Sequence, residues 1–160
     1  MVDSAAQLRA YLRQGTAVVL ADLRGLGETT DPAAFNDPKY YNREYRAAML
    51  ALHEGRPLLT QRIADIALLR LFVRNTEHLY GVPLEIRASG RAIVPALHAA
   101  VLAPAISRLT VEALPLSFEQ LLAQPAAKET YSQVLPGVLR YYDLPDLQRA
   151  LGSRLVVGRP

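Results

Sequence analysis

The sequence predicts an α/β fold: a mostly parallel sheet of about four strands with helices on both faces. Short apolar runs bounded by turn residues alternate with segments whose apolar residues recur at helical spacing, which is the pattern of parallel strands joined by crossover helices. Hydrophobic residues make up 51% of the 160 residues, enough to bury one core of ordinary size. We therefore expect residues 1–160 to form a single domain.

The first helix begins at Asp3 or Ser4, either of which can cap it, and ends at Gly15. Its apolar residues follow helical spacing: Ala5, Leu8, Tyr11 and Leu12. A continuous apolar run comes next, as in a strand buried on both faces, and predicts a strand over residues 17–23. Residues 24–40 carry glycines and two Asp-Pro steps without periodicity, which predicts a long loop.

The rest of the chain continues the alternation of helix and strand. Helices are predicted over residues 42–54, over residues 59–79 and, in short pieces broken by prolines, within residues 117–151. Strands are predicted near residues 84–89, 108–114 and 154–158. The helix after residue 89 begins near Ile93 or Val94, because Pro95 costs least in a first turn. Ser117 is expected to cap a helix.

Composition excludes several classes of site. The net charge is +3, and the arginines are spaced singly rather than in a basic run, so no nucleic-acid partner is predicted. The chain has no cysteine, which excludes disulfides and thiolate metal sites. The three histidines, His53, His78 and His98, have no ligand-type partner at i+3 or i+4. We therefore expect no metal and no cofactor.

The N-terminal stretch and the hydropathy pattern bear on localisation. Residues 1–15 are charged and amphipathic and contain no apolar core, so they do not form a signal peptide. No segment approaches 18 consecutive apolar residues, so no membrane span is predicted. These features predict a soluble chain and do not specify a compartment.

The loop after residue 23 contains Asp22-Leu-Arg24-Gly25-Leu-Gly27. A glycine pair after a strand is one part of a dinucleotide-binding fingerprint. That fingerprint needs a third glycine, where this chain has Thr30, and a helix that opens at once, where this chain has a proline-rich loop. A nucleotide or cofactor site at Gly25 and Gly27 is therefore kept only as an alternative.

Four segments, taken in order, resemble one family. Residues 18–29, an apolar strand ending in Asp-x-Arg-Gly-x-Gly-Glu, resemble the fourth strand and following loop of α/β-hydrolases, in the branch of acetylxylan esterases and prolyl-oligopeptidase-like esterases. Residues 56–73 are similar to the helix that precedes the family's nucleophile, and residues 96–118 are similar to its elbow helix and sixth strand. Residues 135–151 are similar to the segment that leads to its seventh strand. The resemblance covers almost the whole chain and implies a partial α/β-hydrolase fold.

In that family a Gly-x-Ser-x-Gly motif places the nucleophilic serine on a strained turn between strand and helix. Here the turn consists of Ala88, Ser89, Gly90, Arg91 and Ala92. Aligning the motif with residues 88–92 puts Gly90 at the nucleophile position, whereas aligning it with residues 90–94 puts Ala92 there. The strand alternation favours the first register. Neither register supplies a serine, and Ser89 is the remaining weak candidate.

The resemblance implies that other catalytic parts are missing as well. The family's acid follows the seventh strand and its histidine follows the eighth, whereas this chain ends at Arg159 and Pro160, after the seventh. The oxyanion hole uses the N–H after the nucleophile, here that of Arg91, and a donor from a loop that would precede residue 1. We therefore expect a truncated or degenerate member, without the N-terminal strands and the last strand-helix unit.

The function expected from this resemblance is that of a noncatalytic esterase-like domain, a pseudoenzyme with a scaffold or binding role, in which Asp22 and Arg24 pin their loop by charge-assisted hydrogen bonds. One alternative is an active serine esterase that uses Ser89 or Ser117, with the base supplied by His98 or by a partner chain. The other alternative is the nucleotide site at the glycine loop.

The family's strand order also bears on partners. Its third strand lies between the fourth and the fifth, so residues 17–23 and 84–88 would have lost their common neighbour. Either these two strands pair directly, or a gap leaves unpaired edges that favour association with another chain or with the rest of a larger hydrolase domain.

Overall fold

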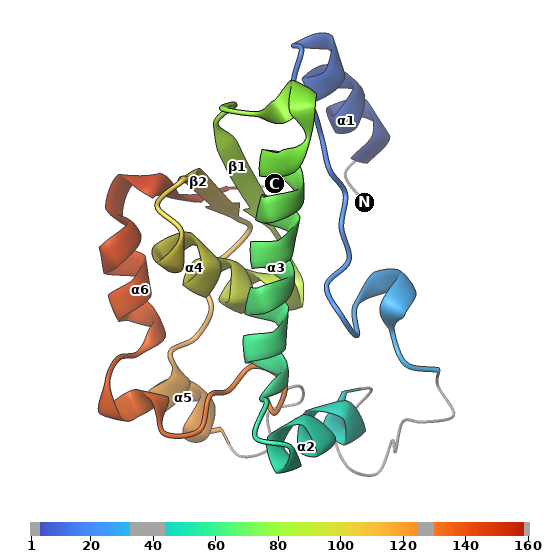
Figure 1. The fold of residues 1–160 in the computed structure, drawn as a ribbon. Coiled ribbons are helices and arrows are strands. Elements are labelled where there is room, and N and C mark those ends of the chain that lie inside the picture. The colour runs from blue at the N-terminus through green and yellow to red at the C-terminus, as the bar shows by residue number, and fades with distance from the viewer. Residues whose placement is uncertain (1–3, 33–43, 125–129, 159–160) are drawn as a thin grey trace.

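The computed structural model describes residues 4–32, 44–124 and 130–158. Asp3, residues 33–40 of the predicted loop, the predicted helix start at Asn42, and Arg159 with Pro160 lie outside these residues. The fold is α/β (Figure 1). Its small parallel sheet has three strands in the order β1-β2-β3. The strands are β1 (Leu84–Ala88), β2 (Ile106–Val111) and β3 (Leu155–Val157).

Six α-helices are described, most of them where helical spacing predicts them. They are α1 (Ser4–Arg13), α2 (Tyr45–His53), α3 (Leu58–Asn75), α4 (Ile93–Leu102), α5 (Phe118–Leu122) and α6 (Leu144–Leu151). Pro95 lies in the first turn of α4, as its missing N–H requires. Pro145 likewise lies in the first turn of α6, so this proline starts a helix rather than breaking one. No helix of the described residues is both long and apolar enough to cross a membrane.

The core lies between the sheet and one layer of helices. In the sheet, Ile86 pairs with Leu109 and Ala88 pairs with Val111, so their side chains share one face. The helix α4 packs on that face and also contacts α3 and α6. Every residue from Ile93 to Ala100 is buried as a result. The central strand β2 is well covered on this face, since Leu109 and Val111 are fully buried.

The predicted strand over residues 17–23 is not part of the sheet, and this prediction of a fourth strand is corrected. The segment is extended but has no strand beside it, and Val19 and Leu20 are 47% and 79% exposed. Only its last residue, Leu23, is buried. An apolar run favours a strand only where a neighbouring strand accepts its backbone hydrogen bonds, and within the described residues none does.

The helices are distributed unequally over the two faces of the sheet. The helices α3, α4 and α6 form one layer (Figure 1). Strands that follow one another in sequence order and are joined by right-handed crossovers place their connecting helices on the same face. The opposite face carries the exposed side chains of Glu85, Arg87 and Arg108. The helix α1 touches this face through Tyr11, whose ring lies 4.9 Å from the Arg87 guanidinium carbon.

Candidate functional site

The turn after β1 lies at the carboxyl end of the sheet, where parallel sheets bind ligands. Ser89 continues the extended backbone, and the chain then reverses at Gly90, which has φ +52°. A single 3-10 turn (Gly90–Ala92) leads directly into α4. A positive φ strains any residue with a side chain, so the sharpest point of the turn falls on Gly90. Ala92, the alternative nucleophile position, has an ordinary φ of −79°.

A carboxylate occupies the outer side of this turn. The N–H of Gly90 donates to Oε1 of Glu112 over 2.6 Å. Glu112 directly follows β2, and the carboxyl ends of neighbouring parallel strands meet at one edge of the sheet. The sequence analysis missed Glu112. An acidic residue at the end of the strand next to the turn was the signal that was available.

A buried ionic cluster lies behind the turn. We call Glu44, Arg62 and Arg91 the Glu44 cluster. The Arg62 guanidinium donates to the Glu44 carboxylate, and the two side chains are 0% and 4% exposed. Arg91, from the turn, places Nη1 3.3 Å from the same carboxylate. Nε of Arg62 donates to the carbonyl oxygen of Arg24 over 3.0 Å. The cluster therefore joins the turn after β1 to the loop after residue 23.

The electrostatics of Glu44 favour its charged form. Burial alone would raise the pKa of the Glu44 carboxyl, but hydrogen bonds from Arg62 and Ser132 and the charge of Arg91 outweigh burial and hold the pKa below its ordinary value. A neighbour of Ser132 supports the turn as well, since Nε2 of Gln133 donates to the carbonyl oxygen of Arg91 over 3.2 Å. Glu44 and Gln133, both distant from the turn in sequence, thus hold the turn through its Arg91.

The loop after residue 23 is held by its own polar side chains. Arg24 donates from Nε to Oδ2 of Asp65 on α3 over 2.9 Å, and from Nη1 to Gln61 over 2.6 Å. The hydrogen bond from Arg24 lowers the pKa of Asp65, and the same bond raises the pKa of Arg24. Oδ2 of Asp22 accepts the N–H of Glu28 over 3.0 Å.

The two loop glycines permit close approaches within the protein itself. A Cβ on Gly27, which has φ +52°, would lie 2.0 Å from the Asp22 carboxylate. A Cβ on Gly25 would lie 3.2 Å from the Arg62 guanidinium. The loop continues as one 3-10 turn (Gly27–Thr29) and not as a helix whose N-terminus faces the loop. A phosphate site at this loop would need free backbone N–H groups, whereas the Asp22 carboxylate already accepts the N–H of Glu28.

The hydroxyl groups considered as nucleophiles differ in their surroundings. Ser117 caps α5, as predicted. Its hydroxyl oxygen accepts the N–H of Gln120 over 3.0 Å, and Oε1 of Gln120 accepts the N–H of Ser117. Ser89 is exposed at the turn. Within the described part of the chain, neither hydroxyl is hydrogen-bonded to an imidazole.

His98 lies in the core, with both ring nitrogens engaged. Nδ1 lies 2.8 Å from the carbonyl oxygen of Val94, which can only accept, so Nδ1 carries the proton. Nε2 then accepts from the hydroxyl of Tyr142 over 3.0 Å. Burial lowers the pKa of His98. The other two histidines, His53 and His78, are exposed.

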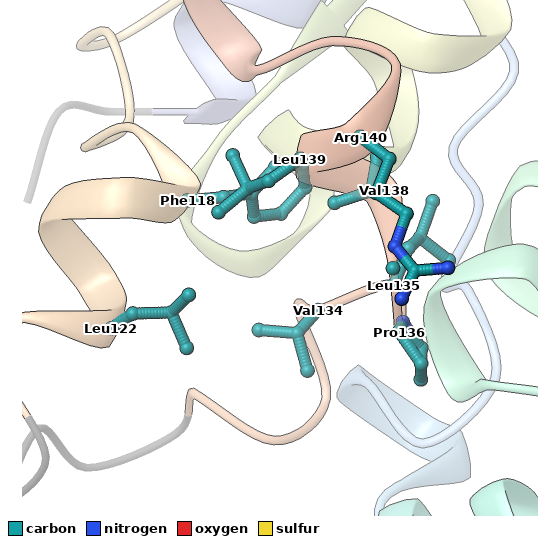
Figure 2. A pocket seen from close by; sticks show the side chains of 9 residues that line it. Phe118, Leu122, Val134, Leu135, Pro136, Val138, Leu139 and Arg140 are labelled. Atoms are coloured by element: carbon teal, nitrogen blue, oxygen red, sulfur yellow. The ribbon is translucent and has the colours of Figure 1, made fainter.

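The structure also has a concavity whose lining includes none of the residues of the turn. It is an apolar hollow of about 450 Å³ between α5 and residues 134–140 (Figure 2). Its lining consists of Phe118, Leu122, Val134, Leu135, Pro136, Gly137, Val138, Leu139 and Arg140. Among these residues only Arg140 is charged and none has a hydroxyl, carboxylate or imidazole, so the hollow offers neither a nucleophile nor a base.

Two further observations complete the description of the site. Among residues 4–32, 44–124 and 130–158, no group of three potential ligand side chains is placed to hold a metal ion. No family model, curated protein or solved structure matches this chain.

Proposed function

We propose that the chain is a noncatalytic α/β-hydrolase-like domain of the esterase branch, with a scaffold or binding role. The observation that carries the proposal is the position of Gly90 in the turn and the hydrogen bond that its N–H makes. This residue lies at the sharpest point of a strand-to-helix turn, where the family places its nucleophile, and its N–H is bound by the Glu112 carboxylate. The turn keeps the shape of a nucleophile elbow without a group that can attack.

Electrostatics at the turn oppose ester hydrolysis. Acyl transfer develops an oxyanion, which enzymes stabilise with free N–H donors and positive potential. The exposed Glu112 carboxylate lies 2.6 Å from the amide next to that of Arg91, the family's donor position. A fixed negative charge at this distance would raise the energy of a neighbouring oxyanion. The Arg91 side chain pairs with the buried Glu44 carboxylate, which gives it a structural role.

The proposal includes a common anchor for residues 17–23 and for the turn after β1. The end of this segment and the end of β1 are bridged by the Arg24 carbonyl, Arg62 and the rest of the Glu44 cluster. Residues 17–23 do not pair with β1, so one edge of β1 is open within the described residues.

The surroundings of the alternative sites favour the noncatalytic proposal over an active esterase or a nucleotide binder. The Ser117 hydroxyl caps α5, and the two ring nitrogens of His98 are hydrogen-bonded to Val94 and Tyr142. In the loop that contains Gly25 and Gly27, the Asp22 carboxylate accepts the N–H of Glu28.

Esterase activity is the direct test. The purified chain should hydrolyse p-nitrophenyl acetate no faster than buffer and should not be labelled by a fluorophosphonate probe, because only an activated serine reacts. Ser89→Ala and Ser117→Ala serve as matched variants. Turnover or labelling that Ser89→Ala abolishes would overturn the proposal in favour of an active serine esterase.

The nucleotide alternative has a separate test. The thermal midpoint of the chain should not rise with NAD, FMN or common nucleoside phosphates, because binding to the native state would raise it by mass action. A rise with one of these ligands that Gly25→Val removes would favour a cofactor site at the loop.

A further inference from the structure

The edge of β1 away from β2 is unpaired within the described residues. β1 is the first strand in the sheet order, and β2 is its one neighbour. The carbonyl oxygen of Leu84 accepts the Ser107 hydroxyl from β2, so Leu84 directs its backbone groups toward β2. Alternate residues of a strand direct their N–H and C=O to the same side. Glu85 and Arg87 therefore direct theirs to the open edge.

An open edge of this kind pairs readily with another strand. Natural edge strands are blunted by prolines, bulges on the open side or inward-pointing charges. β1 contains no proline, and its charged residues Glu85 and Arg87 lie on the exposed face rather than pointing into the core. The register irregularity near Leu84 and Glu85 lies on the side that pairs with β2. Charged side chains on an edge also discourage pairing unless the partner strand places opposite charges across from them.

We propose that a second copy of the chain pairs with this edge, β1 against β1, in antiparallel orientation about a two-fold axis at Ile86. The strand LEIRA is self-complementary in this register. Glu85 lies opposite Arg87 of the partner subunit, and the reciprocal pair forms on the other side of the axis. Opposite charges placed directly across an antiparallel pair stabilise it. A two-fold interface requires this kind of self-complementary patch.

The backbone geometry agrees with this register. Because Glu85 and Arg87 direct their N–H and C=O groups outward, each forms a hydrogen-bonded pair with its counterpart across the axis. Ile86 then faces the partner subunit's Ile86 in the closer, non-hydrogen-bonded type of pair. Ile86 and Leu84 are partly buried against the core, so the apolar face of one sheet continues into the next.

The residues that flank β1 limit the length of the paired segment. Pro83, just before the strand, has no N–H to donate at the open edge. At the other end Gly90 leaves the extended backbone with φ +52°, so pairing is confined to residues 84–88. Arg87 is held on the exposed face by the ring of Tyr11. The inference rests on β1 alone and is independent of the esterase resemblance.

The first test is the mass of the chain in solution as a function of concentration, by sedimentation equilibrium. We expect a reversible dimer. Arg87→Pro removes an outward N–H that β2 does not use, so it should yield a monomer whose circular dichroism is unchanged. Arg108→Ala is the matched control, because Arg108 lies 3.6 Å from Glu85 within one subunit and should leave the dimer intact. A wild-type chain that stays monomeric at millimolar concentration overturns the proposal.

Charge reversal tests the register itself. Glu85→Lys puts like charges opposite each other twice and should weaken the dimer roughly tenfold, and Arg87→Glu should do the same. The combined Glu85→Lys and Arg87→Glu exchange restores both pairs and should recover dimerisation. An equimolar mixture of the two single variants should form a heterodimer tighter than either homodimer. Dimers that persist unchanged in all these variants would place the interface elsewhere and overturn the proposal.

Discussion

Arg62 on α3 donates its guanidinium to the carboxylate of Glu44, and both side chains are almost completely shielded from solvent. The pair also receives Arg91 from the turn after β1 and reaches the Arg24 carbonyl. Two charges buried together at this depth are stable only because each satisfies the other. The pair therefore governs how the loop, α3 and the turn fit together.

Removing one member of this pair should destabilise the fold strongly. Arg62→Met keeps most of the side-chain volume but leaves Glu44 buried without its main partner, which costs about 3–5 kcal/mol of the free energy of unfolding. Urea unfolding followed by circular dichroism measures this cost. Adding Glu44→Gln should recover part of the loss, because the uncompensated charge is then gone. A loss below about 1 kcal/mol for Arg62→Met would show that the pair is not a structural link.

Gly27 and Gly55 form a matched pair for testing the loop after residue 23. Both have positive φ, but a Cβ on Gly27 would collide with Asp22, whereas one on Gly55 would meet nothing within 4 Å. Gly55→Ala should therefore cost about 1 kcal/mol from backbone strain alone, and Gly27→Ala should cost clearly more by thermal unfolding. Asp22→Ala in the Gly27→Ala background should recover the difference. Equal costs for the two glycine variants would contradict the close approach.

The elements that sequence reasoning placed correctly are those set by local pattern. The helix before Gly15, the long helix α3, and the proline in the first turn of α4 all follow from spacing and from the missing N–H of proline. Residues 17–23 have an equally clear pattern, yet no strand forms there. A strand is defined by a distant partner, and a pattern within one segment carries no information about whether that partner is present.

The candidate site was predictable in its position but not in its contents. The carboxyl end of β1 and the glycine at the turn follow from the strand pattern. The Glu44 cluster does not, because Glu44 and Arg62 are brought together by tertiary packing. One signal was present: Arg62 shares a helical face with Leu59 and Ile66, both buried. A charged residue on such a face requires a buried partner.

Asp143 caps two helices at once, which predicts an unusually costly substitution. Its carboxylate accepts the N–H of Leu144 at the start of α6 and the N–H of Phe118 at the start of α5, each over 2.6 Å. Asp143→Ala should therefore cost about 2 kcal/mol or more, roughly twice the usual cost of losing one cap. Ser117→Ala, which removes a cap of α5 alone, is the control and should cost about 1 kcal/mol. Chemical denaturation measures both, and equal effects would contradict the double cap.

His98 gives the fold a dependence on pH near neutrality. Burial lowers the pKa of His98, so the imidazole stays neutral in the folded protein. In the unfolded chain a histidine takes up a proton near pH 6.5. The unfolded state therefore binds more protons as the pH falls below that value, and the contribution of His98 to stability, complete above pH 6.5, is progressively lost on acidification.

We therefore expect the free energy of unfolding to fall between pH 7.5 and 5.5, with a slope of up to about 1.4 kcal/mol per pH unit. The carboxyl groups with lowered pKa values, Glu44 and Asp65, lose their contribution only at more acidic pH, so this window isolates the histidine. Urea titrations across the window measure the slope. His98→Gln should flatten it, whereas His78→Gln, which replaces an exposed histidine, should preserve it. If the slope persists in His98→Gln, another group titrates, and the neutral buried imidazole is not its source.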